Sequence, residues 1–196
     1  MTQKLIEATR ALLSSLDSTL LRPFLDEWPA GTAQAVVPAS LPVLTWLPQV
    51  QRDAEPFAAE LVSEICRAAP SMSWQQTYRA AVDEHFLRNY GWCELAGLKG
   101  PLPSTRVAAG WLLLGPQTTY PSHRHEAEEI YLPLVGVASW LQGDGLWRER
   151  SPGELIHHRP HEPHAMRTRA APLLALYLWR SADLDQQARL DPPARI

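Results

Sequence analysis

The sequence predicts a mainly β fold, in which a helical N-terminal extension precedes an antiparallel β-sandwich or barrel. Apolar residues recur at helical spacing over the first 100 positions, whereas from Pro101 onward short apolar runs alternate with glycine and proline. Short strands separated by such turn residues are typical of antiparallel sandwiches and barrels. We therefore divide the chain into a helical extension, 1–100, a β domain, 101–184, and a polar, proline-bearing tail, 185–196.

Three segments of the extension carry helical signals. The first has leucine and isoleucine on one stripe between residues 5 and 16. The second covers 56–69, with proline in its first turn. The third begins at Ser73, which has capping-box spacing to Gln76. The proline-punctuated stretch 29–48 between the first two predicts a loop with room for one short strand.

In the β domain, runs rich in leucine, valine and tyrosine are bounded by glycine and proline turns. The predicted strands cover 106–114, 128–134, 137–142, 154–157, 164–169 and 173–180. The tail is expected to be loosely ordered, because polar terminal segments bury little surface.

Composition narrows the class of protein. Of the 196 residues, 45% are hydrophobic, which is enough for a core, and the net charge of −3 does not favour nucleic acid. The sequence contains no run of about 18 apolar residues, the length needed to span a membrane. Glu7, Arg10 and Asp17 interrupt the N-terminal apolar positions, so we expect no signal peptide and a cytoplasmic location. Cys66 and Cys93 lack disulfide spacing and are expected to be reduced thiols.

The segment 120–131 carries the strongest chemical signal. In an extended strand, side chains alternate between two faces, so four of its residues share one face: His123, His125, Glu129 and Tyr131. A bulge between His125 and Glu129 would still allow these residues to cluster. Imidazole and carboxylate groups bind Zn, Fe, Mn, Ni or Co. Two or three histidines and one glutamate leave metal positions open for substrate, which favours a catalytic site.

A further ligand is expected from the second histidine-rich segment, 157–164. We favour His164, because it follows a turn and begins a predicted strand that can lie beside the first one. His161 is the rival candidate in the same segment.

The two segments resemble the two motifs of the cupin family. The first motif is matched by His123-x-His125-x₃-Glu129-x₆-Gly136. The second is matched more loosely by Pro152-Gly153-Glu154, then Pro160 and His164. Gln117 stands where cupins usually have glycine, which we interpret as a longer turn before His123.

This resemblance covers 104–181 and implies a double-stranded β-helix, or jelly-roll, barrel. It also implies one bound divalent transition-metal ion, such as Zn, Fe or Mn. A homodimer is compatible with it, because cupins often pair through barrel edges.

A narrower resemblance rests on Tyr131, two residues after Glu129, which extends the pattern to HxHxxxExY. This pattern is similar to that of the cupin-type dimethylsulfoniopropionate (DMSP) lyases of marine bacteria, of the DddQ type. The helical first half and the Tyr120-Pro121 and Pro163-His164 pairs are also similar. The resemblance implies a carbon–sulfur lyase that cleaves DMSP into dimethyl sulfide and acrylate by α-proton abstraction and β-elimination. We expect the helical extension to shield the barrel mouth from water.

The resemblance also implies roles for single residues. His125, Glu129 and His164 would hold the metal, and His123 would be a fourth ligand or orient the substrate. Tyr131 would be the base, because a nearby dication lowers the usual tyrosine pKa of about 10; the alternative is a packed tyrosine.

Substrate contacts are expected from Tyr120, His123, Tyr177 and Trp179. Aromatic faces suit a sulfonium cation, although plain packing is the alternative for Tyr177 and Trp179. The substrate would be a small molecule, with neither nucleic acid nor membrane as a partner. Two rival functions are another cupin enzyme acting on a small carboxylate, such as a dioxygenase or isomerase, and a non-catalytic small-molecule sensor.

Overall fold

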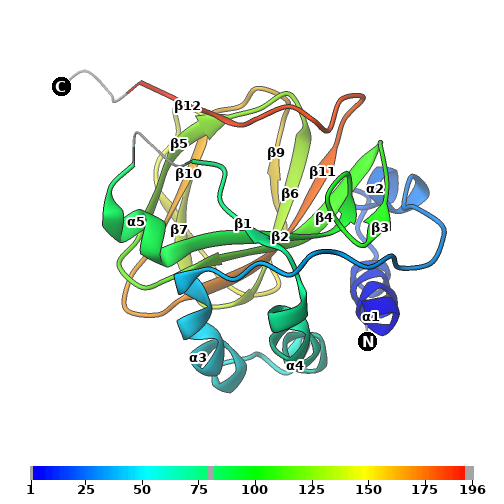
Figure 1. The fold of residues 1–196 in the computed structure, drawn as a ribbon. Coiled ribbons are helices and arrows are strands. Elements are labelled where there is room, and N and C mark those ends of the chain that lie inside the picture. The colour runs from blue at the N-terminus through cyan, green and yellow to red at the C-terminus, as the bar shows by residue number, and fades with distance from the viewer. Residues whose placement is uncertain (1, 79–81, 193–196) are drawn as a thin grey trace.

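A computed structural model describes residues 2–78 and 82–192 of the chain. Two sheets face each other, and helices cover the outer side of the larger sheet (Figure 1). The strand order is β1-β2-β4-β11-β6-β9 in the larger sheet, with β3 beside β2, and β12-β5-β10-β7-β8 in the smaller one. The predicted mainly β fold with N-terminal helices is confirmed.

The larger sheet contains β1 (Trp74–Gln75), β2 (Tyr90–Gly97), β3 (Leu102–Pro103), β4 (Val107–Leu114), β6 (Glu128–Val135), β9 (Ile156–His158) and β11 (Leu173–Arg180). The smaller sheet contains β5 (Thr119–Arg124), β7 (Ala138–Gln142), β8 (Arg148–Arg150), β10 (His164–Thr168) and β12 (Arg189–Leu190). The helices are α1 (Thr2–Ser15), α2 (Arg22–Asp26), η1 (Pro42–Trp46), α3 (Leu47–Arg52), α4 (Ala59–Ala68), η2 (Ala69–Ser71) and α5 (Glu84–Asn89). Within the described residues, no helix is long and apolar enough to cross a membrane.

Alternation along the strands of the larger sheet creates two separate cores. On β6, Ile130, Leu132 and Leu134 pack against the helical layer, whereas Tyr131 faces the interior between the sheets. On β11, the even-numbered leucines face the helices and Tyr177 faces the interior in the same way. Burying one such leucine side chain contributes about 1.5–3 kcal/mol, which fixes the face that each strand presents. The other face of β6 and β11 therefore points into the interior between the sheets, where Tyr131 and Tyr177 lie.

The helix predicted from Ser73 is wrong. Trp74 instead pairs with Cys93 of β2, and the Gln76 side chain donates to backbone carbonyls of Leu87 and Tyr90 rather than capping a helix. Helix α5 begins only after Asp83, whose carboxylate accepts the Phe86 N–H at 2.7 Å. Positions 79–81 of the predicted helix lie outside the described residues.

Other boundaries also differ from the prediction. Strand β2 lies in the part predicted to be helical, and β5 and β8 were not predicted as separate strands. The stretch 29–48 contains η1 and the start of α3, and its only strand-like contact among the described residues is the bridge from Ala39 to Ser73. The tail contributes β12, which pairs with β5. The division of the chain into domains stays a prediction, although β2 belongs to the larger sheet.

Gly136 occupies the turn between β6 and β7 with φ of +86°, a region that favours glycine. A Cβ added there would lie 2.1 Å from the Pro172 carbonyl oxygen. We expect Gly136→Ala to lower the free energy of unfolding by more than about 2 kcal/mol, because left-handed backbone and a steric clash both disfavour alanine. Thermal unfolding followed by circular dichroism checks this, and a Tm decrease smaller than about 2 °C would contradict it.

Candidate metal centre and active site

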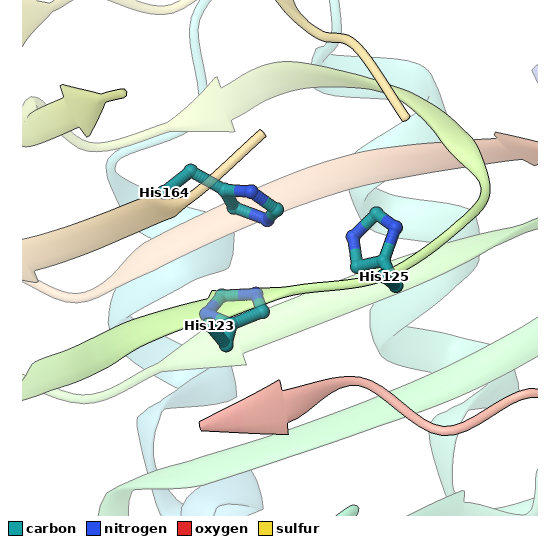
Figure 2. Close-up of side chains that lie close together, drawn as sticks. All are labelled: His123, His125 and His164. Carbon is teal, nitrogen blue, oxygen red and sulfur yellow. The ribbon is translucent and has the colours of Figure 1, made fainter. Parts of the chain in front are cut away.

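Four predicted ligands meet in the interior between the two sheets; we call His123, His125, Glu129 and His164 the ligand cluster. His123 comes from β5, Glu129 from β6 and His164 from β10, while His125 lies in the connection from β5 to β6. One nitrogen of each histidine lies within 4.8 Å of the corresponding nitrogens of the other two (Figure 2). All four side chains are buried. His161, the rival to His164, is exposed and lies outside the cluster.

The path of the chain to this cluster differs from the extended strand that the sequence predicted. β5 belongs to the smaller sheet and β6 to the larger one, so residues 125–127 carry the chain from one sheet to the other. His125 and Glu129 therefore meet across a corner of the barrel rather than along one strand face.

Each histidine is held by the same local contact. Nδ1 of His123, His125 and His164 lies 2.9–3.0 Å from a carbonyl oxygen two residues away in the chain. A carbonyl oxygen can only accept, so each Nδ1 carries a hydrogen, and Nε2 is the ring nitrogen that each histidine can offer to a metal. Second contacts of this kind orient metal-binding histidines in proteins.

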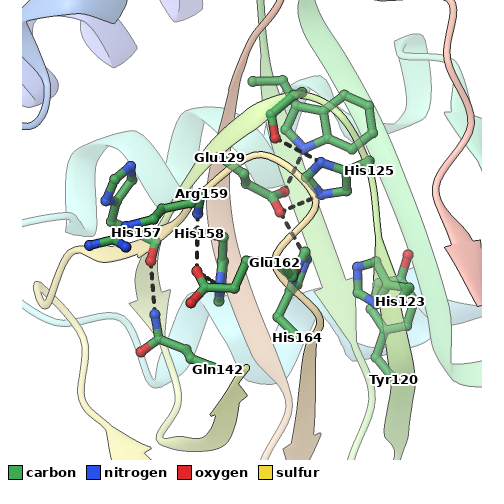
Figure 3. Close-up of polar contacts among 12 residues, drawn as sticks. Tyr120, His123, His125, Glu129, Gln142, His157, His158, Arg159, Glu162 and His164 are labelled. Atoms are coloured by element: carbon green, nitrogen blue, oxygen red, sulfur yellow. Dashed lines mark hydrogen bonds and ion pairs between the residues drawn. The ribbon is translucent and has the colours of Figure 1, made fainter. Parts of the chain in front are cut away.

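Glu129 lies against two of these rings. Its Oε2 is 2.9 Å from Nε2 of His125 and 3.1 Å from Nε2 of His164 (Figure 3). Burial by itself raises the pKa of Glu129, but the His125 and His164 imidazoles outweigh it, and the resulting pKa lies well below the usual value. The carboxylate is therefore ionised at neutral pH.

The chemistry of this donor set fits a divalent transition metal. An unprotonated Nε2 and a carboxylate oxygen are both acceptors, so their approach is favourable only when a proton or a metal ion lies between them. Nε2 of His164 is buried and makes no hydrogen bond among the described residues, which leaves a lone pair for a ligand. The three histidines can hold a metal, and the identity of that metal is not fixed by the donor types.

Trp179 supports the carboxylate. Its indole Nε1 donates to Oε1 of Glu129 at 2.6 Å, and its ring centroid lies 4.2 Å from that of His125. The pairing of β11 with β6 places Trp179 directly beside Glu129. Trp179 therefore orients a ligand of the cluster, a role that the sequence did not suggest.

A bulge in β5 brings Tyr120 to the site, whereas in a regular strand Tyr120 and His123 would lie on opposite faces. Tyr120 pairs with Met166 and His123 pairs with His164. The two pairs are three residues apart on β5 but only two residues apart on β10, so β5 contains one extra residue between them. The extra residue turns Tyr120 toward the same side as His123. Their rings stack with centroids 4.1 Å apart and planes at 10° (Figure 3).

A cavity of about 620 Å³ opens beside the ligand cluster. The five residues predicted to handle substrate or protons all line it: Tyr120, His123, Tyr131, Tyr177 and Trp179. Sequence reasoning missed Thr77, Tyr90 and Trp92, which also line it. No motif marked them, because they come from a segment predicted as helix and from a strand that was not predicted.

The predicted helical extension contributes to the cavity wall through residues 75–77 and through part of 90–99, but not through helices α1 to α4. The cavity walls come from residues 75–77, from strands, from Leu98 and Lys99 and from residues 184–188, whereas helices α1 to α4 cover the outer face of the larger sheet. Figure 1 shows the C-terminal segment running from β11 to β12 along one end of the sandwich. Gln186 holds this segment by accepting the backbone N–H groups of Glu126 and Ala127.

Tyr131 is buried in the barrel interior, directly opposite Tyr177 on β11. Burial, and next the negative charge of Glu129, raise the pKa of Tyr131 well above its usual value. The protein groups around Tyr131 therefore favour the protonated phenol.

His158 is a buried histidine that lies beside the ligand cluster. Its ring stacks on that of His164 with centroids 4.1 Å apart, and neither of its nitrogens has a hydrogen-bond partner in the described part of the chain. The pairing of β9 with β6 places it beside Glu129 and explains its interior position. Burial, and next the His164 ring, lower the pKa of His158 to about 3, so the ring is neutral.

We expect the metal-free protein to lose stability as the pH falls from 7.5 to 5.5. Burial also lowers the pKa of His123 well below its usual value. Below pH 6.5 the unfolded chain binds protons at His123 and His158 that the folded chain excludes, so unfolding becomes more favourable. Below pH 6.5, each such histidine lowers the free energy of unfolding by about 1.4 kcal/mol for every unit by which the pH falls. Urea unfolding at the two pH values measures the loss, and His158→Gln should reduce it; an unchanged pH dependence in that variant would contradict the assignment.

Comparison with known proteins gives consistent matches. The family model for dimethylsulfoniopropionate lyases matches residues 27–175. Dimethylsulfoniopropionate lyase DddQ of Ruegeria pomeroyi is 32% identical over 164 residues, which cover 83% of this chain and 81% of that protein. A putative dimethylsulfoniopropionate lyase DddL of Cereibacter sphaeroides is 33% identical over 121 residues, or 61% of this chain. The match spans only half of the length of DddL.

Solved structures agree with these matches. The crystal structure of Ruegeria pomeroyi DddQ has a TM-score of 0.88 at 29% identity and covers 100% of this chain and 98% of that one. A cupin-2 domain protein from Rhodospirillum rubrum has a TM-score of 0.52 at 15% identity, covering 64% of this chain and 78% of that one. The second match indicates the fold alone. The cupin barrel predicted from the two motifs is confirmed.

Proposed function

Because this chain belongs to the dimethylsulfoniopropionate lyase family, we propose that it is a metal-dependent enzyme that cleaves DMSP into dimethyl sulfide and acrylate. The observation that carries the proposal is one shared cavity, which is lined by Tyr131, by Glu129 and His123 of the ligand cluster, and by the aromatic rings of Tyr177 and Trp179. DMSP has a carboxylate at one end and a sulfonium at the other. The carboxylate would bind at the ligand cluster, and the sulfonium would lie against the aromatic rings.

The ligand cluster would hold the metal through His125, Glu129 and His164, with His123 as a fourth ligand or as a group that orients the substrate. The three Nδ1–carbonyl contacts, which turn Nε2 of each ring toward the metal position, and the ionised Glu129 support this assignment. A divalent ion such as Zn, Fe or Mn bound there would supply positive charge for the substrate carboxylate and for the Tyr131 phenolate.

Tyr131 is the proposed base. As phenolate, its oxygen takes one proton from the carbon next to the substrate carboxylate. The electrons of that C–H bond form the C–C double bond of acrylate, and the electrons of the C–S bond leave with sulfur as neutral dimethyl sulfide. The proton on Tyr131 is then released, so the reaction produces dimethyl sulfide, acrylate and one proton.

The sulfonium end would lie against aromatic faces. Tyr177 and Trp179 line the cavity, and Trp92 meets Tyr177 edge to face with centroids 6.5 Å apart. A cation over such faces gains about 0.5–2 kcal/mol, more when it is desolvated. Trp179 would contribute both its face and its hydrogen bond to Glu129.

The test is release of dimethyl sulfide from DMSP. Purified protein, loaded separately with Zn, Fe or Mn, is incubated with DMSP, and the headspace gas is measured by gas chromatography. We expect dimethyl sulfide and acrylate in equal amounts with at least one metal, and a loss of activity after chelation. Inactivity with every metal would contradict the substrate assignment. Oxygen consumption on other small carboxylates would instead support the rival dioxygenase. The homodimer stays a prediction.

A further inference from the structure

A chain of hydrogen-bonding side chains reaches the cavity from β2 and the segment before α5; we call Trp92, Thr77, Tyr90 and Tyr120 the hydroxyl chain. The Trp92 indole Nε1 donates to Thr77 Oγ1 at 3.1 Å. Thr77 Oγ1 lies 3.1 Å from the Tyr90 hydroxyl, which in turn lies 3.2 Å from the Tyr120 hydroxyl. All four residues line the cavity.

The chemistry of the first member gives this chain a direction. An indole N–H can only donate, so Thr77 Oγ1 accepts from Trp92. The Tyr90 oxygen is the only acceptor for the Thr77 hydroxyl hydrogen among the described residues, so the satisfied arrangement has Thr77 donating to Tyr90. Tyr90 then donates its hydrogen to the Tyr120 oxygen. In this arrangement Tyr120 accepts from Tyr90, and its own hydrogen can point into the cavity.

Tyr90 and Tyr120 are deeply buried, so each of their hydroxyl groups needs a hydrogen-bond partner within the protein or the cavity. Tyr90 is 1% exposed and Tyr120 is 4% exposed. Leaving a buried hydroxyl without a partner costs free energy, so the network is expected to hold the arrangement that satisfies every member. The Tyr90 ring stacks on Phe86 with centroids 4.6 Å apart, which fixes it from the α5 side.

The last member of the hydroxyl chain lies against the ligand cluster. The Tyr120 ring stacks on His123, and both residues belong to β5 on either side of its bulge. A hydroxyl hydrogen presented at this point faces the region where a carboxylate would approach the cluster. The direction of the Tyr120 hydroxyl is thus set by Tyr90 and Trp92 of β2 in the larger sheet and by Thr77 in the segment after β1.

We propose that Tyr90 is a positioning residue, which, together with Thr77 and Trp92, fixes the Tyr120 hydroxyl as a hydrogen-bond donor toward a carboxylate in the cavity. This inference rests on the proposed function for the identity of that carboxylate, the DMSP carboxylate. The geometry of the hydroxyl chain does not depend on it.

Removal of one hydroxyl tests the proposal kinetically. Tyr90→Phe keeps the ring that stacks on Phe86 and is expected to raise KM for DMSP about three- to tenfold, the usual effect of one hydrogen bond, with kcat changed less than twofold. Thr77→Val should act in the same direction, whereas Thr77→Ser, which retains the hydroxyl, should restore wild-type KM. In a Tyr120→Phe background, Tyr90→Phe should change KM less than twofold. An equal effect of Tyr90→Phe with and without Tyr120 would overturn the proposal, because it would indicate a purely structural role.

A spectroscopic measurement separates this inference from the proposed function. In protein labelled with ¹³C at tyrosine Cζ, the Tyr120 resonance is assigned by its absence in Tyr120→Phe. We expect this resonance to shift in Tyr90→Phe and in Thr77→Val, and to stay in place in Thr77→Ser. If it shifts but the wild-type protein releases no dimethyl sulfide, only the proposed function fails. If it does not shift in Tyr90→Phe, the positioning role is wrong whether or not DMSP is cleaved.

Discussion

Tyr131→Phe is expected to lower the release of dimethyl sulfide from DMSP by roughly 10²- to 10⁴-fold, the usual contribution of a positioned base. The phenylalanine ring retains the packing of Tyr131 against Trp140, whose ring centroid lies 5.0 Å away. Only the hydroxyl that is proposed to take the proton is lost. The metal content per chain should therefore stay at the wild-type value, as measured by inductively coupled plasma mass spectrometry.

Tyr177→Phe is the matched control for this experiment. Tyr177 lies directly opposite Tyr131 on the neighbouring strand and lines the same cavity, and phenylalanine retains its aromatic face. We expect this variant to lose less than about tenfold in kcat/KM. If Tyr131→Phe retained activity similar to that of Tyr177→Phe, Tyr131 would not be the base. If Tyr131→Phe lost its metal, Tyr131 would be needed for metal binding, and its role as base would have to be tested separately.

His125→Ala and His164→Ala are each expected to weaken metal binding by more than about 100-fold, because changes even to groups behind the ligands cost 10- to 100-fold. Each substitution removes one buried Nε2 and leaves Glu129 with one imidazole neighbour. Metal content after dialysis against a competing chelator measures the loss, and dimethyl sulfide release should fall with it.

His161→Asn is the matched control for the histidine substitutions. His161 lies in the same histidine-rich segment as His164, but it is exposed and has φ of +63°. Asparagine tolerates that backbone conformation better than alanine. We expect this variant to bind metal as the wild-type protein does. Unchanged metal content in both His125→Ala and His164→Ala would show that the ligand cluster does not hold the metal.

The parts of this fold that the sequence predicts well are those that depend on local pattern. The strand predicted at 173–180 matches β11 at both ends, because alternating residues there face two different apolar layers. The strands predicted from residues 106, 128, 137 and 164 are close to β4, β6, β7 and β10 for the same reason. The first helix is also present, since one buried stripe is enough to define it.

Strand β2 could not be predicted in this way. Its sequence includes Gly91 and has no clean alternation, because it is buried on both faces for much of its length. A Cβ at Gly91 would lie 2.9 Å from Leu41 and 3.0 Å from Val43, so the glycine accommodates the η1 segment that packs on this strand. Such contacts come from residues about 50 positions away in the chain, and local propensity does not contain them.

The sequence by itself determined which chemistry is present. Histidine, glutamate and tyrosine at the spacing of 123–131, with a further histidine at 164, were sufficient to predict that the ligand cluster comes together and to nominate Tyr131 as the candidate base. The ligand positions are separated by few residues, and turns or bulges between them change the path of the chain without separating the side chains.

The tertiary structure alone decided what surrounds that cluster. The bulge in β5 turns Tyr120 toward the cavity, and strand pairing places Trp179 and His158 beside Glu129. The hydroxyl chain joins residues from two sheets. These neighbours are set by register and by long-range packing, in which a shift of one residue moves every side chain to the opposite face. The sequence therefore identifies the groups that can bind and react, and only the folded barrel determines which side chains orient them.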